Sequence, residues 1–256
     1  MPGPIPISLV VITRDAQDDI ADCLASAPFV AEALVVDSGS ADHTVEIARR
    51  SGARVLSQAW LGFGPQKQYG VQMAAHDWVL CLDADERVSP ELARSIAALL
   101  AGPAPAHPAY AAARRNRFLG RWLAHGEGYP DWTTRLFDRR RARWSDDPVH
   151  EQVIADGRVG RLAGDLMHAS AESIERYVAK QNRYTTLQAD MLHARGKRSS
   201  AITLVAAPVA RFLRFYVFKL GFLDGAPGFA HIAIGAFASF LKHAKLRALD
   251  QIVRRP

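Results

Sequence analysis

The chain has 256 residues, of which 49% are apolar, so it can bury one large core or two small ones. This composition excludes an intrinsically disordered chain, and the net charge of +6 and pI near 9.6 favour anionic partners such as nucleotide phosphates, nucleic acid or a membrane face. The isolated Cys23 and Cys81 exclude a disulfide framework, and the first residues lack the pattern of a secretory signal, so we expect a cytoplasmic protein.

Short apolar runs alternate with helix-like stretches over the first hundred residues. Runs rich in β-branched residues predict strands at 7–12, 33–36, 54–56 and 78–82. Helical patterns with start and stop signals predict helices at 18–26, 44–51, 66–75 and 91–100. The last of these follows Ser89-Pro90-Glu91, in which a capping hydroxyl precedes proline and an acid. The alternation predicts a doubly wound α/β domain with a mainly parallel sheet.

The second half of the chain is more basic and more helical. A connector rich in proline and glycine covers 102–108, and a helical pattern begins near Ala171. From Ile202 to Leu220, apolar residues recur with a period near 3.6, which predicts an amphipathic helix that Pro208 should kink. We therefore expect a catalytic domain over 1–170 and a basic helical extension over 171–256.

A pair of carboxylates follows the strand predicted at 78–82. Asp83 and Asp85 are separated by one small residue, so they can converge at the carboxyl end of that strand. Hard oxygen ligands of this kind suit Mg²⁺ or Mn²⁺, which leave positions open for a diphosphate. An acidic turn that merely ends a strand is the structural alternative, since short motifs give false positives.

Two further segments favour a ligand site at the same edge of the sheet. Asp37, like Asp83, follows an apolar strand, and it opens a turn that contains glycine. The glycine-bearing loop 62–66 leads to Lys67 near the start of a helix, where a phosphate or diphosphate contact is expected. An ordinary glycine loop with a solvated lysine is the alternative. Neither a GxGxxG nor a GxxxxGK[ST] pattern is present.

Six blocks of the chain together resemble glycosyltransferase family 2, which has the GT-A fold, and within it the branch of lipopolysaccharide core β-glucosyltransferases. The blocks span most of the chain in the expected order: VVDSGSADHT at 35–44, WLGFGPQK at 60–67, DWVLCLDADERVSPEL at 77–92, RLF at 135–137, VHE at 149–151 and LGFLDGAPG at 220–228. Their joint occurrence is far more specific than any single block.

The resemblance implies a UDP-sugar donor and assigns residues to it. Asp37 would bind the base, Thr13 at the end of the first strand would line the nucleotide pocket, and Asp83 with Asp85 would hold the diphosphate and a Mg²⁺ or Mn²⁺ ion. His168 is a candidate third metal ligand or diphosphate contact, as a late histidine is in some GT-A enzymes, although a lone histidine is more often structural.

The resemblance also implies the chemistry of transfer. Glu151, in the His150-Glu151 motif, would be the general base that takes the proton of the acceptor hydroxyl during in-line attack, which inverts the anomeric centre. Asp147 is the nearest rival base. Arg135 is a candidate contact to the acceptor or the diphosphate, unless it belongs to a solvated basic stretch with Arg139 and its neighbours.

One block departs from the family pattern, in which the first strand usually ends in Thr-x-Asn-Glu. Here the strand ends in Thr13-Arg14-Asp15-Ala16, which adds a charge near the nucleotide and removes the glutamate. The role of Thr13 therefore rests on less support, and none can be assigned to Ala16.

The basic C-terminal part predicts a peripheral membrane anchor. Between Arg195 and the end, eleven lysines and arginines stand against Asp224 and Asp250. On the predicted amphipathic helix, Phe215 and Phe218 share a side with Arg211 and Arg214, as expected at an anionic lipid interface on the inner face of the bacterial inner membrane. Packing against the catalytic domain or a second subunit is the alternative reading of these apolar stripes.

The resemblance favours transfer of a hexose, glucose in the first instance, to a hydroxyl of the lipopolysaccharide inner core, with no nucleic-acid partner. Transfer to a polyprenyl phosphate carrier is the alternative within the same class. A non-catalytic protein that binds lipid or nucleic acid on a GT-A-like fold is an alternative from another class. A sugar-nucleotide pyrophosphorylase should open with a glycine-rich basic loop, which residues 13–16 do not provide.

Overall fold

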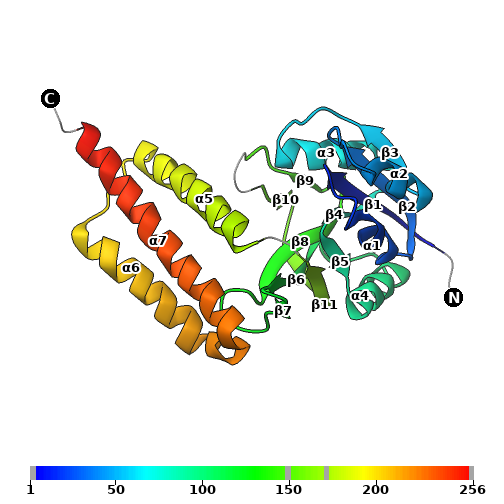
Figure 1. Ribbon diagram of the computed structural model, residues 1–256. Coiled ribbons are helices and arrows are strands. Elements are labelled where there is room, and N and C mark those ends of the chain that lie inside the picture. Colours follow the sequence, from blue (N-terminus) through cyan, green and yellow to red (C-terminus); the bar gives the residue numbers. More distant parts are fainter. Residues whose placement is uncertain (1–3, 148–150, 170–172, 254–256) are drawn as a thin grey trace. The chain divides into compact units, whose positions relative to one another are not determined.

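The computed structural model describes residues 4–147, 151–169 and 173–253 and forms two compact units (Figure 1). Unit 1 contains residues 1–115 and 131–169, and unit 2 contains residues 116–130 and 170–256. The division expected at residue 170 placed the segment 116–130 with the catalytic part, whereas in the structure this segment belongs to the helical unit. Unit 2 is therefore assembled from two separate stretches of the chain.

The main sheet of nine strands has a parallel part and an antiparallel part (Figure 1). The parallel part consists, in spatial order, of β3 (Arg54–Ser57), β2 (Val30–Asp37), β1 (Ile5–Thr13) and β4 (Trp78–Asp83). The order continues with β8 (Asp131–Asp138), β6 (Ala109–Phe118), β11 (Val159–His168) and β5 (Glu86–Val88). The pairs β4–β8, β8–β6 and β11–β5 are antiparallel. Beside this sheet, β9 (Ala142–Trp144) pairs with β10 (Val153–Ala155).

The parallel strands are buried on both faces, as their continuous apolar sequence predicts. On β1, Leu9 and Val11 join one apolar cluster, whereas Val10 points to the other face and joins a second cluster. The first cluster includes side chains from α1 (Ile20–Ala25), α2 (Thr44–Arg50) and α4 (Pro90–Ala101), and the second includes side chains from α3 (Phe63–Met73). The doubly wound arrangement expected for residues 7–100 is confirmed, with each expected strand and helix present.

The start of α4 shows how local sequence fixes an element. The Ser89 hydroxyl accepts a hydrogen bond from the Leu92 N–H at 3.2 Å, and Pro90 occupies the first helical position. The same hydroxyl accepts from the Asp165 N–H at 3.0 Å, which ties the helix to β11. One side chain therefore satisfies two backbone donors.

Unit 2 consists of three long helices and the segment 116–130. The helical part comprises α5 (Ile174–Ala194), α6 (Ala201–Leu213), a π-helical turn η1 (Arg214–Phe218), a 3₁₀ turn η2 (Gly221–Asp224) and α7 (Gly225–Val253). In the other part, β7 (Arg121–Trp122) pairs with the end of β6. The described residues contain one helical segment, Ala201–Phe218, that is long and apolar enough to cross a membrane, and none of it is buried.

Asp224, in the 220–228 block, binds the segment 116–130 to the helices. Its carboxylate is 1% exposed and accepts hydrogen bonds from the Ala124 N–H at 3.0 Å and the His125 N–H at 2.8 Å. A side chain at Gly221 could not fit, because its Cβ would lie 2.7 Å from the Phe215 carbonyl oxygen. The block that resembles the family branch is thus a structural junction within unit 2.

We expect Ser89→Ala to destabilise unit 1, because two backbone N–H groups lose their acceptor. The free energy of unfolding should fall by about 1–2 kcal/mol, measured by urea denaturation. Ser51→Ala, which removes an exposed hydroxyl at the end of α2, is the matched control and should change stability by less than about 0.5 kcal/mol. Equal losses in the two variants would contradict the role of Ser89.

Candidate functional site

The carboxyl ends of β1, β2 and β4 meet at one edge of the sheet. The register pairs Thr13 with Asp37 and Ile12 with Asp83, so the candidate residues of three strands lie at the same level. In open α/β sheets this edge is the usual place for a ligand.

Asp37 and Thr13 differ in how their polar atoms are used. The buried Asp37 carboxylate accepts hydrogen bonds from the N–H groups of Gly39 at 2.9 Å and Ser40 at 3.0 Å, and Gly39 has a φ of 91°. The Thr13 hydroxyl is buried and has no hydrogen-bond partner among the described residues. A buried hydroxyl without a partner is unfavourable, so Thr13 has an unused donor and acceptor for a ligand at this edge.

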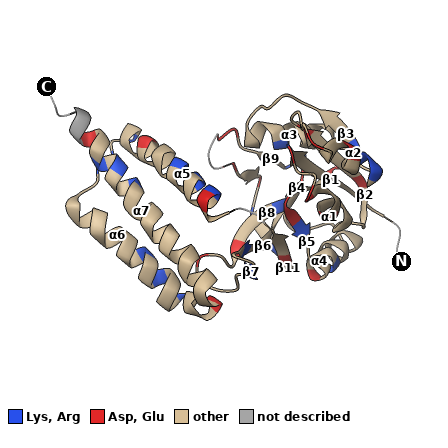
Figure 2. Cartoon of the chain, viewed as in Figure 1, with Lys and Arg blue, Asp and Glu red and all other residues tan. Residues whose placement is uncertain are grey.

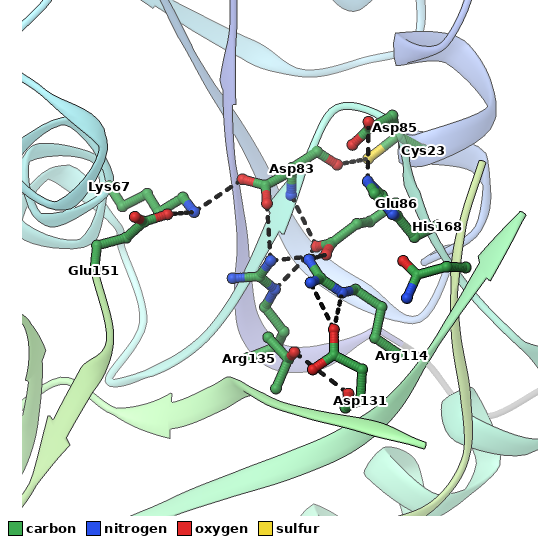
Figure 3. Close-up of polar contacts among 12 residues, drawn as sticks. Cys23, Lys67, Asp83, Asp85, Glu86, Arg114, Asp131, Arg135, Glu151 and His168 are labelled. Atoms are coloured by element: carbon green, nitrogen blue, oxygen red, sulfur yellow. Dashed lines mark hydrogen bonds and ion pairs between the residues drawn. The ribbon is translucent and has the colours of Figure 1, made fainter. Parts of the chain in front are cut away.

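A buried arginine connects the first carboxylate of the motif to its neighbour Glu86 (Figure 3). Arg135 on β8 donates from Nη2 to Asp83 Oδ2 at 2.8 Å, and from Nε and Nη2 to the two oxygens of Glu86 at 2.9 and 2.7 Å. Glu86 is completely buried and also lies 3.5 Å from Arg114, which in turn pairs with Asp131 at 2.6 Å. The Arg135 guanidinium is therefore bound to carboxylates of the protein itself.

The charges around Asp83 fix its ionisation state. Burial by itself would raise the pKa of the Asp83 carboxyl, but the positive charges of Arg135 and Lys67 outweigh it and hold the pKa well below its usual range. Burial likewise opposes the charged form of Arg135, yet the carboxylates of Glu86 and Asp83 raise its pKa. Asp83 is therefore an anion with a fixed orientation.

Lys67 bridges Asp83 and Glu151, which are far apart in the sequence (Figure 3). Its ammonium lies 3.0 Å from Asp83 Oδ1 and 3.1 Å from Glu151 Oε1, with the Trp144 ring centroid at 4.7 Å. The side chain of Lys67 is only 3% exposed, whereas that of Glu151 is 20% exposed. The expected base and the expected donor-binding carboxylate thus share one cation.

The loop before Lys67 is fixed by two tight contacts. The buried Gln66 side chain donates to the Gln58 carbonyl oxygen and accepts from the Leu61 N–H, each at 3.2 Å. A Cβ at Gly64 would lie 2.0 Å from the Ser145 carbonyl oxygen, so only glycine allows this approach. The glycine loop therefore places Lys67 rather than serving as a flexible linker.

The other expected residues lie nearby or outside the described part. Val149 and His150, from the VHE block, are outside the described residues, and Asp147 is exposed. His168, at the end of β11, has its Nε2 3.2 Å from Asp85 Oδ2. Burial raises the pKa of the Asp85 carboxyl, but the hydrogen bond and charge of His168 outweigh it and lower the pKa.

Asp85 and His168 form a pair rather than a complete metal centre. No group of three His, Cys, Asp or Glu side chains suited to a metal ion occurs among the described residues. The donor set nevertheless fits a divalent ion that takes its remaining ligands from water and substrate phosphate, as Mg²⁺ commonly does. Sequence reasoning singled out both residues but missed Glu86 and Arg114, although Glu86 adjoins the motif.

We expect Arg135→Met to destabilise the chain, because Glu86 would remain buried without its main cation. The free energy of unfolding should fall by about 3–5 kcal/mol in urea denaturation. Arg143→Met is the matched control, since that side chain is 58% exposed and lies 4.0 Å from an exposed Asp146, and its effect should stay below about 0.5 kcal/mol. Equal stability of the two variants would argue against a structural role for Arg135.

Comparison with known structures bears on the fold. Glucosyl-3-phosphoglycerate synthase from Mycobacterium tuberculosis, in complex with phosphoglyceric acid, superposes with a TM-score of 0.50 over 77% of this chain and 82% of that chain. The two sequences are 17% identical, so the likeness concerns the architecture alone. It confirms the GT-A type of fold that the sequence blocks implied.

Comparison with known sequences bears on the family. The lipopolysaccharide core biosynthesis glycosyltransferase LpsC of Rhizobium meliloti is 29% identical over 259 residues, which cover 98% of this chain and 96% of LpsC. An uncharacterized glycosyltransferase of Rickettsia prowazekii, RP128, is 32% identical over 265 residues, covering 95% of this chain and 87% of that protein. The model of glycosyl transferase family 2 matches residues 8–155. With more than half of its length matched, the chain belongs to glycosyltransferase family 2.

Proposed function

We propose that the protein transfers a hexose, glucose in the first instance, from a UDP-sugar to a hydroxyl of the lipopolysaccharide inner core, with inversion at the anomeric carbon. The observation that carries this proposal is the Lys67 bridge, which holds a carboxylate that is 20% exposed, Glu151, beside Asp83 at the ligand-binding edge of the sheet. The acceptor class is supported by the similarity to LpsC over nearly the whole chain.

In this proposal the donor binds at the ends of the parallel strands. Thr13 offers its unpaired buried hydroxyl to the nucleotide, and Asp37 lies beside it for the base. Asp83, held by two cations, would orient the diphosphate side of the donor.

Asp85 and His168 would hold a Mg²⁺ or Mn²⁺ ion together with the diphosphate oxygens. When bound, such an ion neutralises charge on the departing UDP. The protein contributes the position of the two side chains, which their mutual hydrogen bond fixes before an ion arrives.

Glu151 is the proposed general base. Its carboxylate would accept the proton of the acceptor hydroxyl as that oxygen attacks the anomeric carbon on the face opposite the diphosphate. A single displacement of this kind inverts the centre. Asp147 remains the rival, and its side chain is exposed near the undescribed residues 148–150.

Lys67 was expected to contact the diphosphate directly, but its ammonium is already within 3.1 Å of two carboxylates and almost fully buried. We propose that it acts chiefly on the base, by positioning Glu151, because Asp83 is also held by Arg135. Its positive charge helps to lower the pKa of the Asp83 carboxyl, and its contact with Glu151 holds that side chain in one orientation.

The acceptor is lipid-linked in this proposal, so we place the enzyme at the inner face of the bacterial inner membrane as a peripheral protein. A polyprenyl phosphate acceptor and a non-catalytic role remain the alternatives, and the experiments below separate them from the proposed reaction.

We expect metal-dependent UDP release when the wild-type protein is assayed with a panel of UDP- and GDP-sugars, Mn²⁺ or Mg²⁺ and purified lipopolysaccharide. Asp85→Ala should abolish this metal-dependent UDP release. Glu151→Gln should lower turnover by about 10²–10⁴-fold while leaving UDP binding unchanged, because a general base acts only on the chemical step. Asp147→Asn is the matched control.

A larger loss in Asp147→Asn than in Glu151→Gln would move the base to Asp147. Turnover with a polyprenyl phosphate, in place of lipopolysaccharide, would favour the alternative acceptor. If no nucleotide sugar is bound or turned over with either acceptor, the transferase proposal fails.

A double-mutant cycle tests the role of Lys67. If Lys67 works through Glu151, Lys67→Met should lower turnover in the wild-type background but by less than about threefold when Glu151 is already glutamine. UDP affinity, measured by calorimetry, should change by less than about threefold in Lys67→Met. Additive losses together with weakened UDP binding would instead show that Lys67 contacts the diphosphate.

A further inference from the structure

Five apolar side chains form an exposed stripe along α6 and η1. They recur at spacings of three or four residues and lie on one face of the helix, and each is between 45% and 80% exposed: Ile202, Val205, Val209, Leu213 and Val217. We call this set the α6 stripe. In Figure 2 the first part of α6 carries no charged residue. An exposed apolar face of this length marks an interaction site rather than ordinary surface.

Other side chains of α6 and η1 are already packed within unit 2. Phe212 and Tyr216 contact the Phe229 ring of α7 at centroid distances of 6.0 and 5.7 Å, and Arg211 forms an ion pair with Glu127. These contacts fix the rotation of α6 about its axis. The α6 stripe stays exposed beside these contacts, and two of its members, Val209 and Leu213, border α7.

An apolar groove between α6 and α7 extends the stripe. The groove has a volume of about 430 Å³, and no charged or hydrogen-bonding side chain lines it: its walls are Pro208, Val209, Phe212, Leu213, Ala233, Ala236, Phe237 and Phe240. Val209 and Leu213 belong to both the groove and the stripe. At the C-terminal end of η1, Phe218 is 79% exposed and adds an aromatic side chain beside the cations Arg214 and Lys219.

The charge of residues 195–253 favours an anionic partner for the α6 stripe. Nine lysines and arginines but only two acids lie between residues 195 and 253, and one of these acids, Asp224, is buried. A second copy of the chain would bring the same positive charge to the stripe, which opposes association. An anionic bilayer offers acyl chains to the stripe and negative headgroups to the flanking cations.

We propose that the α6 stripe and the α6–α7 groove dock unit 2 on an anionic phospholipid bilayer, with α6 lying in the plane of the interface. The segment 201–218 is near the lower limit of length for crossing a bilayer and contains Arg211 and Arg214, whose placement in the hydrocarbon is unfavourable. Insertion across the membrane would also break the contacts of α6 with α7 and Glu127.

This inference deepens the proposed function and rests on it for its purpose, because a lipid-linked acceptor lies in the same bilayer. Its test does not require turnover. If the protein binds vesicles but transfers no sugar, the docking proposal stands and the proposed reaction fails. If it transfers sugar but does not bind vesicles, the proposed reaction stands and the docking proposal fails.

The experiment is flotation of the full chain with vesicles of phosphatidylcholine, with or without about one third phosphatidylglycerol. Wild type should float with the anionic vesicles and be released as salt is raised to about 0.5 M. The Val205→Asp/Val209→Asp double variant should bind at least about tenfold more weakly, because two charges enter the apolar face. Arg214→Gln/Lys219→Gln should reduce the preference for anionic vesicles.

The matched control is Ile174→Asp/Val178→Asp on α5, which adds the same two charges at the same helical spacing to side chains that are 46% and 37% exposed. It should float like wild type. Circular dichroism and urea denaturation verify that each variant is folded. Labelling of wild type by a photoreactive phospholipid gives a second readout, and its adducts should fall within 201–218 and the groove.

Three results would overturn the proposal. Wild type could remain unbound with anionic vesicles, or the lipid adducts could map outside 201–218 and the groove. Light scattering could also show a dimer that Val205→Asp/Val209→Asp converts to a monomer, which would assign the stripe to a second copy of the chain.

Discussion

The buried ion pair between Arg135 and Glu86 is the constraint on which the candidate site depends. Both side chains are buried, so the loss of either would leave the other without its main partner, and together they hold the turn that follows β4. The antiparallel pairing of β4 with β8 places Arg135 next to that turn. Asp83 accepts a hydrogen bond from the same guanidinium, and this internal contact fixes the orientation of its carboxylate.

From this pair, a chain of alternating charges crosses the site. Asp83 connects Arg135 to Lys67, and Lys67 connects Asp83 to Glu151. A change at any member alters the electrostatic surroundings of the next. The donor-binding and proton-accepting parts of the proposed reaction are therefore coupled before any substrate is present.

The first hundred residues could be interpreted from sequence because their signals are local. Apolar runs, the Ser89 cap and glycine stops fix the alternation of strands and helices within a few residues. The antiparallel part could not be interpreted in this way, because β6 and β8 carry arginines among small or aromatic residues and their register depends on distant partners. The Lys67–Glu151 contact spans 84 positions, a separation that no periodicity encodes. Only the resemblance of whole blocks to the family predicted, before the structure, that Lys67 and Glu151 belong to one site.

Unit 2 is assembled from two separate stretches that meet at Asp224, and this constrains how the chain can be shortened or recombined. A cut at residue 170 would separate the helices from the segment 116–130 and leave the Ala124 and His125 N–H groups without their buried acceptor. A chimaera that exchanges the C-terminal helices with those of a relative should keep its fold only when the segment 116–130 is taken from the same relative. In evolution, these two stretches are expected to change together although a hundred residues separate them.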